Sequence, residues 1–346
     1  MSDDLKKAST IVDQFGLPGA RVSPLGHGLI NRTFLVQTDQ SERFVLQQVN
    51  AIFPTAINRD IDALTKHLAA HGLPTPEIVS TKTGHLWVND HDDIWRLLTF
   101  IEGQSHDALT NTGQAFEAGK LLARFHHAAS DLNHKFANLR LGVHDTARHL
   151  QALEKALVTH TAHRCYLEVA DIAGEILEYA KSLPALPETP DRIVHGDPKI
   201  NNILFEAGTD KAICLVDLDT ITRMPLPLEL GDAFRSWCNP AGEDERAGEF
   251  SSELFAQSLA GYREAAEGWI TSKEWSAILP ATETILVELA ARFCADALNE
   301  SYFGWDPESF AGRSEHNQVR AMGQLSVARS LVAQKPALQT IVDKLI

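Results

Sequence analysis

The sequence predicts an α+β fold of two lobes, in which a small antiparallel β-sheet lobe precedes a larger, mainly helical lobe. Short apolar runs separated by polar turns occupy the first hundred residues, which is typical of strands. From Thr110 onward the apolar residues recur at helical spacing instead. We therefore expect an N-terminal lobe at residues 1–102 and a C-terminal lobe at residues 103–346.

Composition and charge exclude several classes of protein. With 346 residues, 44% of them hydrophobic and 22% charged, the chain has the composition of a globular protein. No apolar run approaches the ~20 residues that a membrane helix needs, and no apolar signal core follows Met1, so we expect a cytoplasmic protein. A formal net charge of −15 argues against a nucleic-acid partner, which requires a basic face. The four cysteines lack metal-binding spacing, and we expect reduced thiols.

The N-terminal lobe is expected to contain a leading helix, several strands and one long helix. Apolar residues at near-helical spacing predict the leading helix at residues 3–15. The predicted strands lie at residues 22–25, 33–37, 44–49, 85–88 and 94–101. A helix at residues 54–71 ends before Gly72. The last strand leads into Leu97–Gly103, which we interpret as the hinge between the lobes.

The turn between the first two strands contains glycines in a pattern that favours phosphate binding. Gly26 and Gly28 provide positions at which backbone amides can approach a phosphate group closely. An ordinary hairpin turn would use the same residues, because the pattern is only part of a full G-x-G-x-x-G motif. Asn31, at the end of this turn, either caps it or contacts a phosphate.

The C-terminal lobe is expected to consist mainly of helices. After a first helix that begins near Thr110, others are predicted at residues 146–160, 165–183, 250–265, 280–299 and 317–333, and a further one opens at Ala233. Asp145 precedes the second of these helices and is a favourable N-cap residue. His126 and His127 end the first helix, where we expect helix-end cations or core partners rather than metal ligands.

One hairpin in this lobe brings polar residues together. Apolar runs at residues 203–205 and 212–216 flank a polar, glycine-containing connection, which predicts two paired strands. Folding about this turn brings Asn202 and Asp217 to the same end, and Asp197 lies five residues before Asn202. Phosphoryl transfer requires such a set, because one carboxylate orients the acceptor hydroxyl while the other groups hold magnesium on the phosphates.

The same stretch matches the kinase pattern H-R-D-x-x-x-x-N followed by a metal-binding Asp, with Gly196 in place of the arginine. Five specified positions match by chance in a chain of this length about one time in 10⁴. Lys199 lies two residues after Asp197, within reach of a transferred phosphoryl group. The alternative is a solvated loop with ordinary Asp and Asn turn residues.

At these residues the sequence resembles the aminoglycoside phosphotransferase and choline kinase group, which are small-molecule kinases with a protein-kinase-like fold. The signature is His195-Gly-Asp197, then Asn202, then Asp217 after an apolar strand. Within this group the sequence is most similar to the N-acetylhexosamine 1-kinases. That narrower likeness rests on Gly28–Phe34, Val45–Asn50, Val143–Thr146, Lys199–Asn202, Asp217–Thr220, Gly231–Arg235, Arg292–Asp296 and His316–Arg320.

The resemblance implies ATP and Mg²⁺ as cofactors and a small-molecule acceptor. Asp197 is expected to act on the acceptor hydroxyl and Lys199 on the transferred phosphoryl group. Magnesium is expected to be held by Asn202, Asp217 and Asp219, and the loop to be supported by His195 and Asp232. Asp232 is otherwise explained as the cap of the helix that opens at Ala233.

The nucleotide is expected to lie between the glycine turn and the hinge. Thr99 and Ile101 belong to the hinge segment, where such kinases hold adenine through main-chain groups. Gln47, however, stands where the third strand of a kinase usually places a basic residue for the α and β phosphates. Either Lys199 or an arginine supplies the missing charge, or this lobe holds its nucleotide loosely.

Three functions remain open from the sequence. The first is an ATP-dependent kinase of a small hydroxylated metabolite, for which the resemblance implies the anomeric hydroxyl of an N-acetylhexosamine, with Arg292, Tyr302 and Asn317 as sugar-binding residues. Arg292 is equally explained as a salt-bridged helix residue. The second is a kinase of a cationic acceptor such as an aminoglycoside, choline or homoserine, for which Glu243–Glu245 offers negative charge. The third, indicated only by Gln47, is a nucleotide-binding pseudokinase. The sequence does not indicate the oligomeric state.

Overall fold

The computed structural model describes residues 3–26, 30–138, 142–266 and 268–345. The chain divides into two compact units. The first, called here the sheet unit, comprises residues 1–102, 128–139 and 216–221; the second, the helical unit, comprises residues 103–127, 140–215 and 222–346. One division between the units follows Glu102, and two short later segments also belong to the sheet unit.

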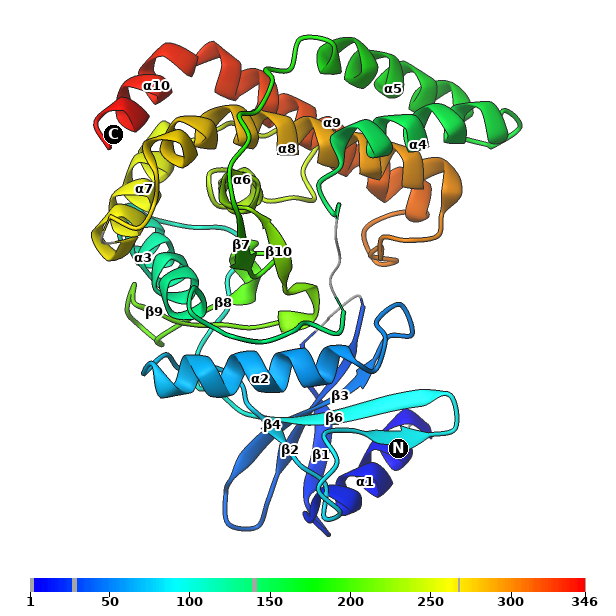
Figure 1. Ribbon diagram of the computed structural model, residues 1–346. Coiled ribbons are helices and arrows are strands. Elements are labelled where there is room, and N and C mark those ends of the chain that lie inside the picture. Colours follow the sequence, from blue (N-terminus) through cyan, green and yellow to red (C-terminus); the bar gives the residue numbers. More distant parts are fainter. Residues whose placement is uncertain (1–2, 27–29, 139–141, 267, 346) are drawn as a thin grey trace. The chain divides into compact units, whose positions relative to one another are not determined.

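The sheet unit is built on an antiparallel sheet of six strands (Figure 1). The strands are β1 (Arg21–Pro24), β2 (Arg32–Gln37), β3 (Arg43–Val49), β4 (Ile78–Val79), β5 (Val88–Asp90) and β6 (Asp93–Thr99). They are ordered β1-β2-β3-β6-β4, and β5 pairs with β6. Four of the five predicted strands are therefore confirmed, whereas the one predicted at residues 85–88 overlaps β5 only at Val88, and the two-residue β4 was not predicted.

One face of this sheet carries the apolar core. Helix α1 (Asp3–Val12) and the 3₁₀ turn η1 (Asp13–Phe15) cover this face, so that Ile11 and Phe15 pack with Leu46, Trp95 and Leu97. Side chains alternate between the two faces of a strand. The residues between these core positions on β3 and β6 therefore point to the opposite face of the sheet.

Helix α2 (Ile57–Ala70) also belongs to the sheet unit and confirms the helix predicted there. Its buried residues Ile57, Ile61, Leu64 and Leu68 recur at spacings of three and four, which gives one apolar stripe along the helix. The final turn contains His67 and is followed by His71 as the C-terminal cap residue.

The helical unit contains two small β-structures and eight helices among its described residues. Strands β7 (Asp191–Val194) and β10 (Thr222–Pro225) pair with each other, as do β8 (Ile203–Phe205) and β9 (Ala212–Leu215). The helices are α3 (Thr112–Ala129), α4 (Thr146–Thr159), α5 (Tyr166–Ala180), α6 (Leu226–Trp237), α7 (Ser252–Ala266), α8 (Ser272–Asn299), α9 (Arg313–Ala333) and α10 (Lys335–Asp343). The predicted β8–β9 hairpin is confirmed, and Asp145 caps α4 by accepting a hydrogen bond from the Arg148 backbone N–H.

Helix α8 is the centre of the helical unit, and the prediction of its start was wrong. The helix begins at Ser272 rather than at Pro280. Thr271 and Glu274 form a capping box at its N-terminus, which satisfies backbone donors there. Proline usually disrupts a helix, but α8 is buried almost all round, so packing holds the helix together through Pro280.

Helix α6 also begins earlier than predicted, at Leu226 rather than at Ala233. Pro227 lies in its first turn, where the missing backbone N–H of proline costs no helical hydrogen bond. Asp232 therefore lies inside the helix, and the helix-cap role considered for it was wrong. Strands β7 and β10 and helix α10 were not predicted.

Helices α3 and α7 approach each other at two glycines. A Cβ atom added at Gly119 would lie 2.0 Å from the backbone oxygen of Ser258. One added at Gly261 would lie 1.9 Å from the backbone oxygen of Phe116. No side chain fits at either position without separating the two helices.

Across the described residues, no helix is both long and apolar enough to cross a membrane.

Candidate active site

The predicted catalytic stretch forms the loop that follows β7 and leads into β8. Gly196 has a φ of +84°, in the left-handed region that glycine adopts without strain. This conformation explains why glycine stands at the position where the kinase pattern has arginine. Asp197 comes next, and the 3₁₀ turn η2 (Ile200–Asn202) then brings Asn202 back towards it.

Asp197 lies among positive and polar groups of the helical unit. The Nζ atom of Lys199 lies 3.2 Å from Oδ2 of Asp197. The Asn202 side-chain amide donates to the backbone oxygen of Asp197 at 2.9 Å and lies 3.4 Å from Oδ2. Burial favours the protonated form of Asp197, but the charges of Lys199, Arg235 and His195 outweigh it and hold the pKa below its usual range. Asp197 is therefore an ionised carboxylate at neutral pH.

The pH profile of activity tests this electrostatic arrangement. Replacing Lys199→Met removes one of the charges that lower the pKa of Asp197, so this pKa should rise. Because the base acts only when ionised, the acid limb of kcat/KM should move to higher pH than in the wild-type protein. Lys211→Met, on the exposed hairpin turn, is the matched loss of charge and should leave the profile in place. Identical acid limbs in wild type and Lys199→Met would contradict the assignment.

Helix α6 holds this loop through residues that sequence reasoning missed. The buried Glu229 carboxylate accepts hydrogen bonds from the backbone N–H groups of His195 and Gly196, at 2.9 and 3.0 Å. The Ser236 hydroxyl accepts from the Ile200 backbone N–H at 3.1 Å. Glu229 and Ser236 are seven residues apart and therefore share one face of the helix. The Trp237 indole adds a bond to the Pro198 backbone oxygen at 2.8 Å, so that α6 fixes the loop along its length.

Asp232 contacts Arg235 and acts on the catalytic loop through that residue. Its carboxylate accepts from Nε of Arg235 at 2.9 Å, and the same guanidinium pairs with Glu243. Arg235 is one of the charges that hold the pKa of Asp197 down. The expected bracing role of Asp232 thus takes the form of orienting Arg235. His195 is fully buried, and its Nδ1 lies 3.4 Å from the Asp197 backbone nitrogen.

The β8–β9 hairpin determines how Asp217 relates to Asn202 along the chain. Ile203 pairs with Leu215, and Asn202 and Asp217 come one residue before and two residues after this pair. Asp217 has a φ of 64°, which places it in the left-handed region that Asp and Asn tolerate best among residues with a Cβ. The 3₁₀ turn η3 (Leu218–Thr220) follows it within the sheet unit.

Asp219 has a partner that was not expected. Both carboxylate oxygens bind the guanidinium of Arg96 on β6, at 2.5 and 2.8 Å, and the pair is almost completely buried. Arg96 lies directly opposite Gln47 in the β3–β6 register, and its guanidinium also donates to Oε1 of Gln47 at 2.6 and 2.9 Å. Gln47 therefore stands on β3 where a basic residue was expected, and a basic residue, Arg96, lies directly opposite it on the neighbouring strand β6. Both carboxylate oxygens of Asp219 thus already accept from Arg96, and the assignment of Asp219 as a magnesium ligand stays a prediction.

The Asn31 side chain is bonded within the sheet unit. It donates to Asp219 at 2.6 Å and accepts from the Asn50 backbone N–H at 2.9 Å, and its assignment to a phosphate contact stays a prediction. Gly26 is exposed with a φ of +69°, as a turn glycine requires. Gly28 lies outside the described residues.

The hinge residues lie at and beyond the end of β6. The Thr99 backbone N–H donates to the Glu77 backbone oxygen at 2.9 Å, and the Thr99 hydroxyl accepts from the Glu77 backbone N–H, also at 2.9 Å. Ile101 follows the strand and is half-buried. The assignment of both residues to adenine binding stays a prediction.

The three expected sugar-binding residues differ in their access to solvent. Asn317 is completely buried, and its amide donates to Asp296 at 3.0 Å. Asp296 also accepts from the backbone N–H of Tyr302, so the Asn317 amide helps to hold this loop, whereas its buried Oδ1 has no partner; the assignment of Asn317 to the sugar stays a prediction. Tyr302 itself is 46% exposed. Arg292 is half-buried, and its guanidinium lies over the Phe303 ring, 5.7 Å from the ring centre. Among the described contacts it forms no salt bridge, although a salt bridge was the alternative role expected for it.

A comparison with protein families assigns the chain. The model of the phosphotransferase enzyme family matches residues 21–267, which is most of the chain and includes the whole catalytic stretch. The chain belongs to this family. It is therefore a phosphotransferase, as the sequence resemblance predicted, and the matched range includes His195, Asp197, Asn202 and Asp217.

Curated relatives of this phosphotransferase are distant. The homoserine kinase of Paramagnetospirillum magneticum (strain ATCC 700264 / AMB-1) is 25% identical over 245 residues, which cover 69% of this chain and 70% of the relative. The homoserine kinase of Burkholderia cenocepacia (strain HI2424) is 30% identical over 113 residues, a third of each chain.

Solved structures share the fold of the phosphotransferase at low sequence identity. The microcompartment-associated aminopropanol kinase has a TM-score of 0.63 at 14% identity, covering 96% of this chain and 98% of its own. Choline kinase from Cryptosporidium parvum Iowa II has a TM-score of 0.62 at 14% identity, with coverage of 94% and 96%. Amicoumacin kinase, solved with AMP-PNP, Ca²⁺ and amicoumacin, has a TM-score of 0.59 at 15% identity, with coverage of 99% and 96%. The predicted protein-kinase-like fold, with a small antiparallel sheet and a larger helical part, is confirmed.

Proposed function

We propose that this phosphotransferase transfers the γ-phosphoryl group of ATP to the anomeric hydroxyl of an N-acetylhexosamine, giving a sugar 1-phosphate. The ionised Asp197, held at the end of a fixed loop beside Lys199, supports the transfer itself. The choice of a neutral acceptor over a cationic one rests on a different observation, namely the pairing of carboxylates in the acidic run Glu243–Glu245.

In the proposed reaction Asp197 accepts a hydrogen bond from the acceptor hydroxyl and takes its proton as the oxygen attacks the γ-phosphorus, while the bond from this phosphorus to the β–γ bridging oxygen breaks and ADP leaves. An anomeric hydroxyl is more acidic than other sugar hydroxyls and asks less of this base. Lys199 lies beside the carboxylate and would neutralise negative charge on the transferred group. Orientation and charge then account for most of the rate acceleration.

Asn202 and Asp217 fit a magnesium ion by their chemistry. The Asn202 amide nitrogen is bound to Asp197, which leaves Oδ1 as the free ligand atom of that side chain. Asp217 offers a carboxylate. It lies two residues after Leu215, which pairs with Ile203, the residue next to Asn202. Carboxylate and amide oxygens are the ligands that Mg²⁺ prefers. When bound, the ion would neutralise charge on the phosphates.

A cationic acceptor would need unpaired acidic groups, and two of the three residues in the run expected to supply them are already paired. Glu243 binds the Arg235 guanidinium. Asp244 binds Arg320 at 2.6 Å and His316 at 2.8 Å. Although burial opposes it, these two partners lower the pKa of Asp244 to about 2. Because Glu243 and Asp244 are neutralised within the helical unit, only the exposed Glu245 of this run remains to attract an amine, which favours the neutral sugar.

A buried donor in the same unit supports a hydrogen-bonding acceptor. Nδ1 of His144 donates to Glu288 at 2.9 Å, whereas its Nε2 is buried and has no hydrogen-bond partner. Burial opposes the charge on this imidazole, but Glu288 and Asp232 outweigh it and raise the pKa of His144. A protonated ring presents an N–H at Nε2, and a buried donor without a partner is costly. We assign this N–H to an oxygen of the sugar.

A second candidate function is the phosphorylation of an amine-bearing alcohol. Its support is that the curated relatives are homoserine kinases and that the similar structures include aminopropanol and choline kinases. All of these names describe acceptors with an amino or quaternary ammonium group.

One assay separates the two functions. The protein is incubated with ATP and magnesium together with N-acetylglucosamine, N-acetylgalactosamine, homoserine, choline or aminopropanol, and ADP release is measured. Phosphorus NMR of the product then shows whether phosphorus couples to an anomeric proton. Turnover of either sugar to a 1-phosphate supports the proposal. Turnover of an amino alcohol alone replaces it with the second candidate, and a sugar 6-phosphate would also overturn it.

Removal of the proposed magnesium ligands should uncouple metal from nucleotide binding. Asp217→Asn keeps a residue that tolerates the left-handed backbone, so the variant should fold while losing the ligand charge. We expect it to lose the magnesium-dependent tightening of AMP-PNP binding, and Asn202→Ala to lose less, because an amide oxygen carries no charge. Titration calorimetry with and without magnesium measures both, with Asp210→Asn on the hairpin turn as the control. Unchanged coupling in both variants would refute the assignment.

The role of His144 is tested by separating the two substrates. Replacing His144→Ala should raise KM for the sugar about tenfold or more, the effect of a hydrogen bond with a charged donor, and leave KM for ATP unchanged. His149→Ala is the matched control, because its Nε2 already bonds the Val143 backbone oxygen at 2.7 Å. Equal changes in both variants would indicate that His144 only stabilises the helical unit.

A further inference from the structure

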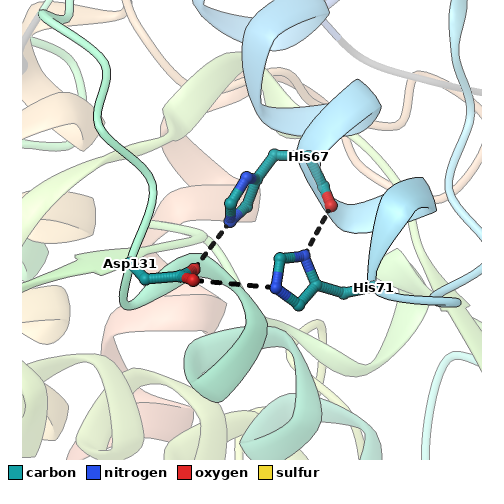
Figure 2. A group of neighbouring side chains, drawn as sticks. All are labelled: His67, His71 and Asp131. Carbon is teal, nitrogen blue, oxygen red and sulfur yellow. Dashed lines mark hydrogen bonds and ion pairs between the residues drawn. The ribbon is translucent and has the colours of Figure 1, made fainter.

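Three metal-ligating side chains gather in the sheet unit, and the phosphotransferase reaction uses none of them. His67 and His71 lie one turn apart at the C-terminal end of α2, and Asp131 lies in the segment 128–139 (Figure 2). Nε2 of His67 is 2.8 Å from Oδ1 of Asp131, and Nε2 of His71 is 3.8 Å from Oδ2. One ligand atom from each of the three residues lies within 4.8 Å of the other two.

The protonation of the His71 ring is fixed by its neighbour. Its Nδ1 lies 2.9 Å from the His67 backbone oxygen, which can only accept, so Nδ1 carries the hydrogen (Figure 2). Nε2 of the neutral ring is then a lone pair, and it faces a carboxylate oxygen. A cation between these two acceptors, either a proton on the ring or a metal ion, makes the contact favourable. A backbone carbonyl holding the far nitrogen of a histidine is also the usual outer contact of a metal-ligating histidine.

His67 completes the set with a nitrogen that a metal ion can take over. Its Nε2 lies 2.9 Å from the Ala128 backbone oxygen as well as near Asp131, so this nitrogen carries a hydrogen in the metal-free protein. Moving that hydrogen to Nδ1 frees the Nε2 lone pair. Zinc binds nitrogen and oxygen at about 2.0–2.2 Å, so tetrahedral ligand atoms lie about 3.4 Å apart. The observed separations of 2.8 and 3.8 Å lie on either side of this value.

We propose that His67, His71 and Asp131 bind a divalent transition-metal ion, with Zn²⁺ as the best fit, separately from the magnesium of phosphoryl transfer. Two imidazoles and a carboxylate suit zinc, whereas magnesium prefers oxygen ligands. The His71 and Asp131 side chains are 40% and 68% exposed, so water can complete a tetrahedral shell. The ion would fasten the segment 128–139 to the end of α2 and stabilise the sheet unit.

Zinc binding to the full-length protein tests this site. Titration calorimetry with Zn²⁺ is performed with AMP-PNP and excess magnesium present, so that the proposed catalytic positions are already filled. The wild-type protein should bind one zinc ion per chain, and His71→Gln and Asp131→Asn should bind about tenfold more weakly or not at all. His91→Gln is the matched control. His91 also lies beside a carboxylate, that of Asp90 at 3.1 Å, but among the described residues no third ligand joins this pair.

Two further measurements make the result decisive. Cobalt substituted for zinc should give the visible absorption of a four-coordinate ion with nitrogen ligands, and His71→Gln should abolish it. Zinc should also raise the melting temperature of the wild type and of His91→Gln but not of Asp131→Asn. Zinc binding that is equal in wild type and both ligand variants would overturn the proposal, as would the absence of stoichiometric binding. The melting temperatures without metal show whether each variant is folded.

Discussion

Replacing Asp197→Asn should reduce kcat about 10²–10⁴-fold and leave AMP-PNP binding and the melting temperature close to wild type. The amide cannot take the proton of the acceptor hydroxyl, but it has the same shape as the carboxylate. It can still lie beside the Asn202 amide and Lys199, so the loop has no reason to rearrange. The Glu229 contacts to the loop backbone do not involve the Asp197 side chain either. The loss should therefore appear in the chemical step.

The control for this variant is Asp191→Asn. Asp191 lies six residues earlier in the chain, at the exposed start of β7, and its replacement removes the same charge. It should retain full activity. Single-turnover measurements on the acceptor identified by the substrate assay would separate chemistry from product release. If Asp197→Asn kept more than half of the wild-type kcat, or if it bound AMP-PNP much more weakly, the assignment of Asp197 as the base would be wrong.

Replacing Arg96→Met should destabilise the sheet unit by about 3–5 kcal/mol, because it leaves the buried Asp219 charge without its partner. Arg96 and Asp219 are 2% and 1% exposed, so water cannot compensate. Gln47 and Asn58 would also lose a donor. Because η3 begins directly after Asp217, the loss should spread to nucleotide binding, and AMP-PNP with magnesium should bind more weakly. Denaturant titration and calorimetry measure the two effects.

An exposed pair in the same unit provides the control. Arg32 binds Asp4 at 2.8 Å, but these side chains are 61% and 54% exposed, so Arg32→Met should cost little. The double variant Arg96→Met with Asp219→Asn removes both charges and should recover part of the stability lost in Arg96→Met alone. If Arg96→Met and Arg32→Met lost equal stability, the buried pair would have no special role in the sheet unit.

Local patterns were sufficient to predict much of the fold. Apolar spacing placed α2, α4 and α5 within a few residues, and the polar turn placed the β8–β9 hairpin. The cap at Asp145 also follows from neighbours in the sequence. These features depend on interactions within one element or between adjacent ones, which a sequence pattern records directly.

The features that escaped prediction depend on residues far apart in the chain. Arg96 compensates for Gln47 because β3 and β6 pair in one register, and its contact with Asp219 joins residues 123 positions apart. Glu229 holds a loop that lies more than 30 residues earlier. Helices α6 and α8 begin earlier than predicted, because packing keeps residues helical that in the sequence signal a turn, among them Pro227 and Pro280. Burial of Asn317 likewise depends on tertiary packing, which polarity alone does not indicate.

The contact between α3 and α7 has a consequence for how this protein tolerates genetic variation. Gly119 and Gly261 each lie against a backbone oxygen of the opposite helix, so alanine, normally the mildest exchange, is excluded at both. Further along α3, Phe125 packs near the His195 ring and His126 lies 3.5 Å from Glu229. Displacement of α3 would therefore disturb the groups that hold the catalytic loop. A mutational screen scored by growth would rank these two glycines beside the reacting residues, although neither belongs to the proposed chemistry.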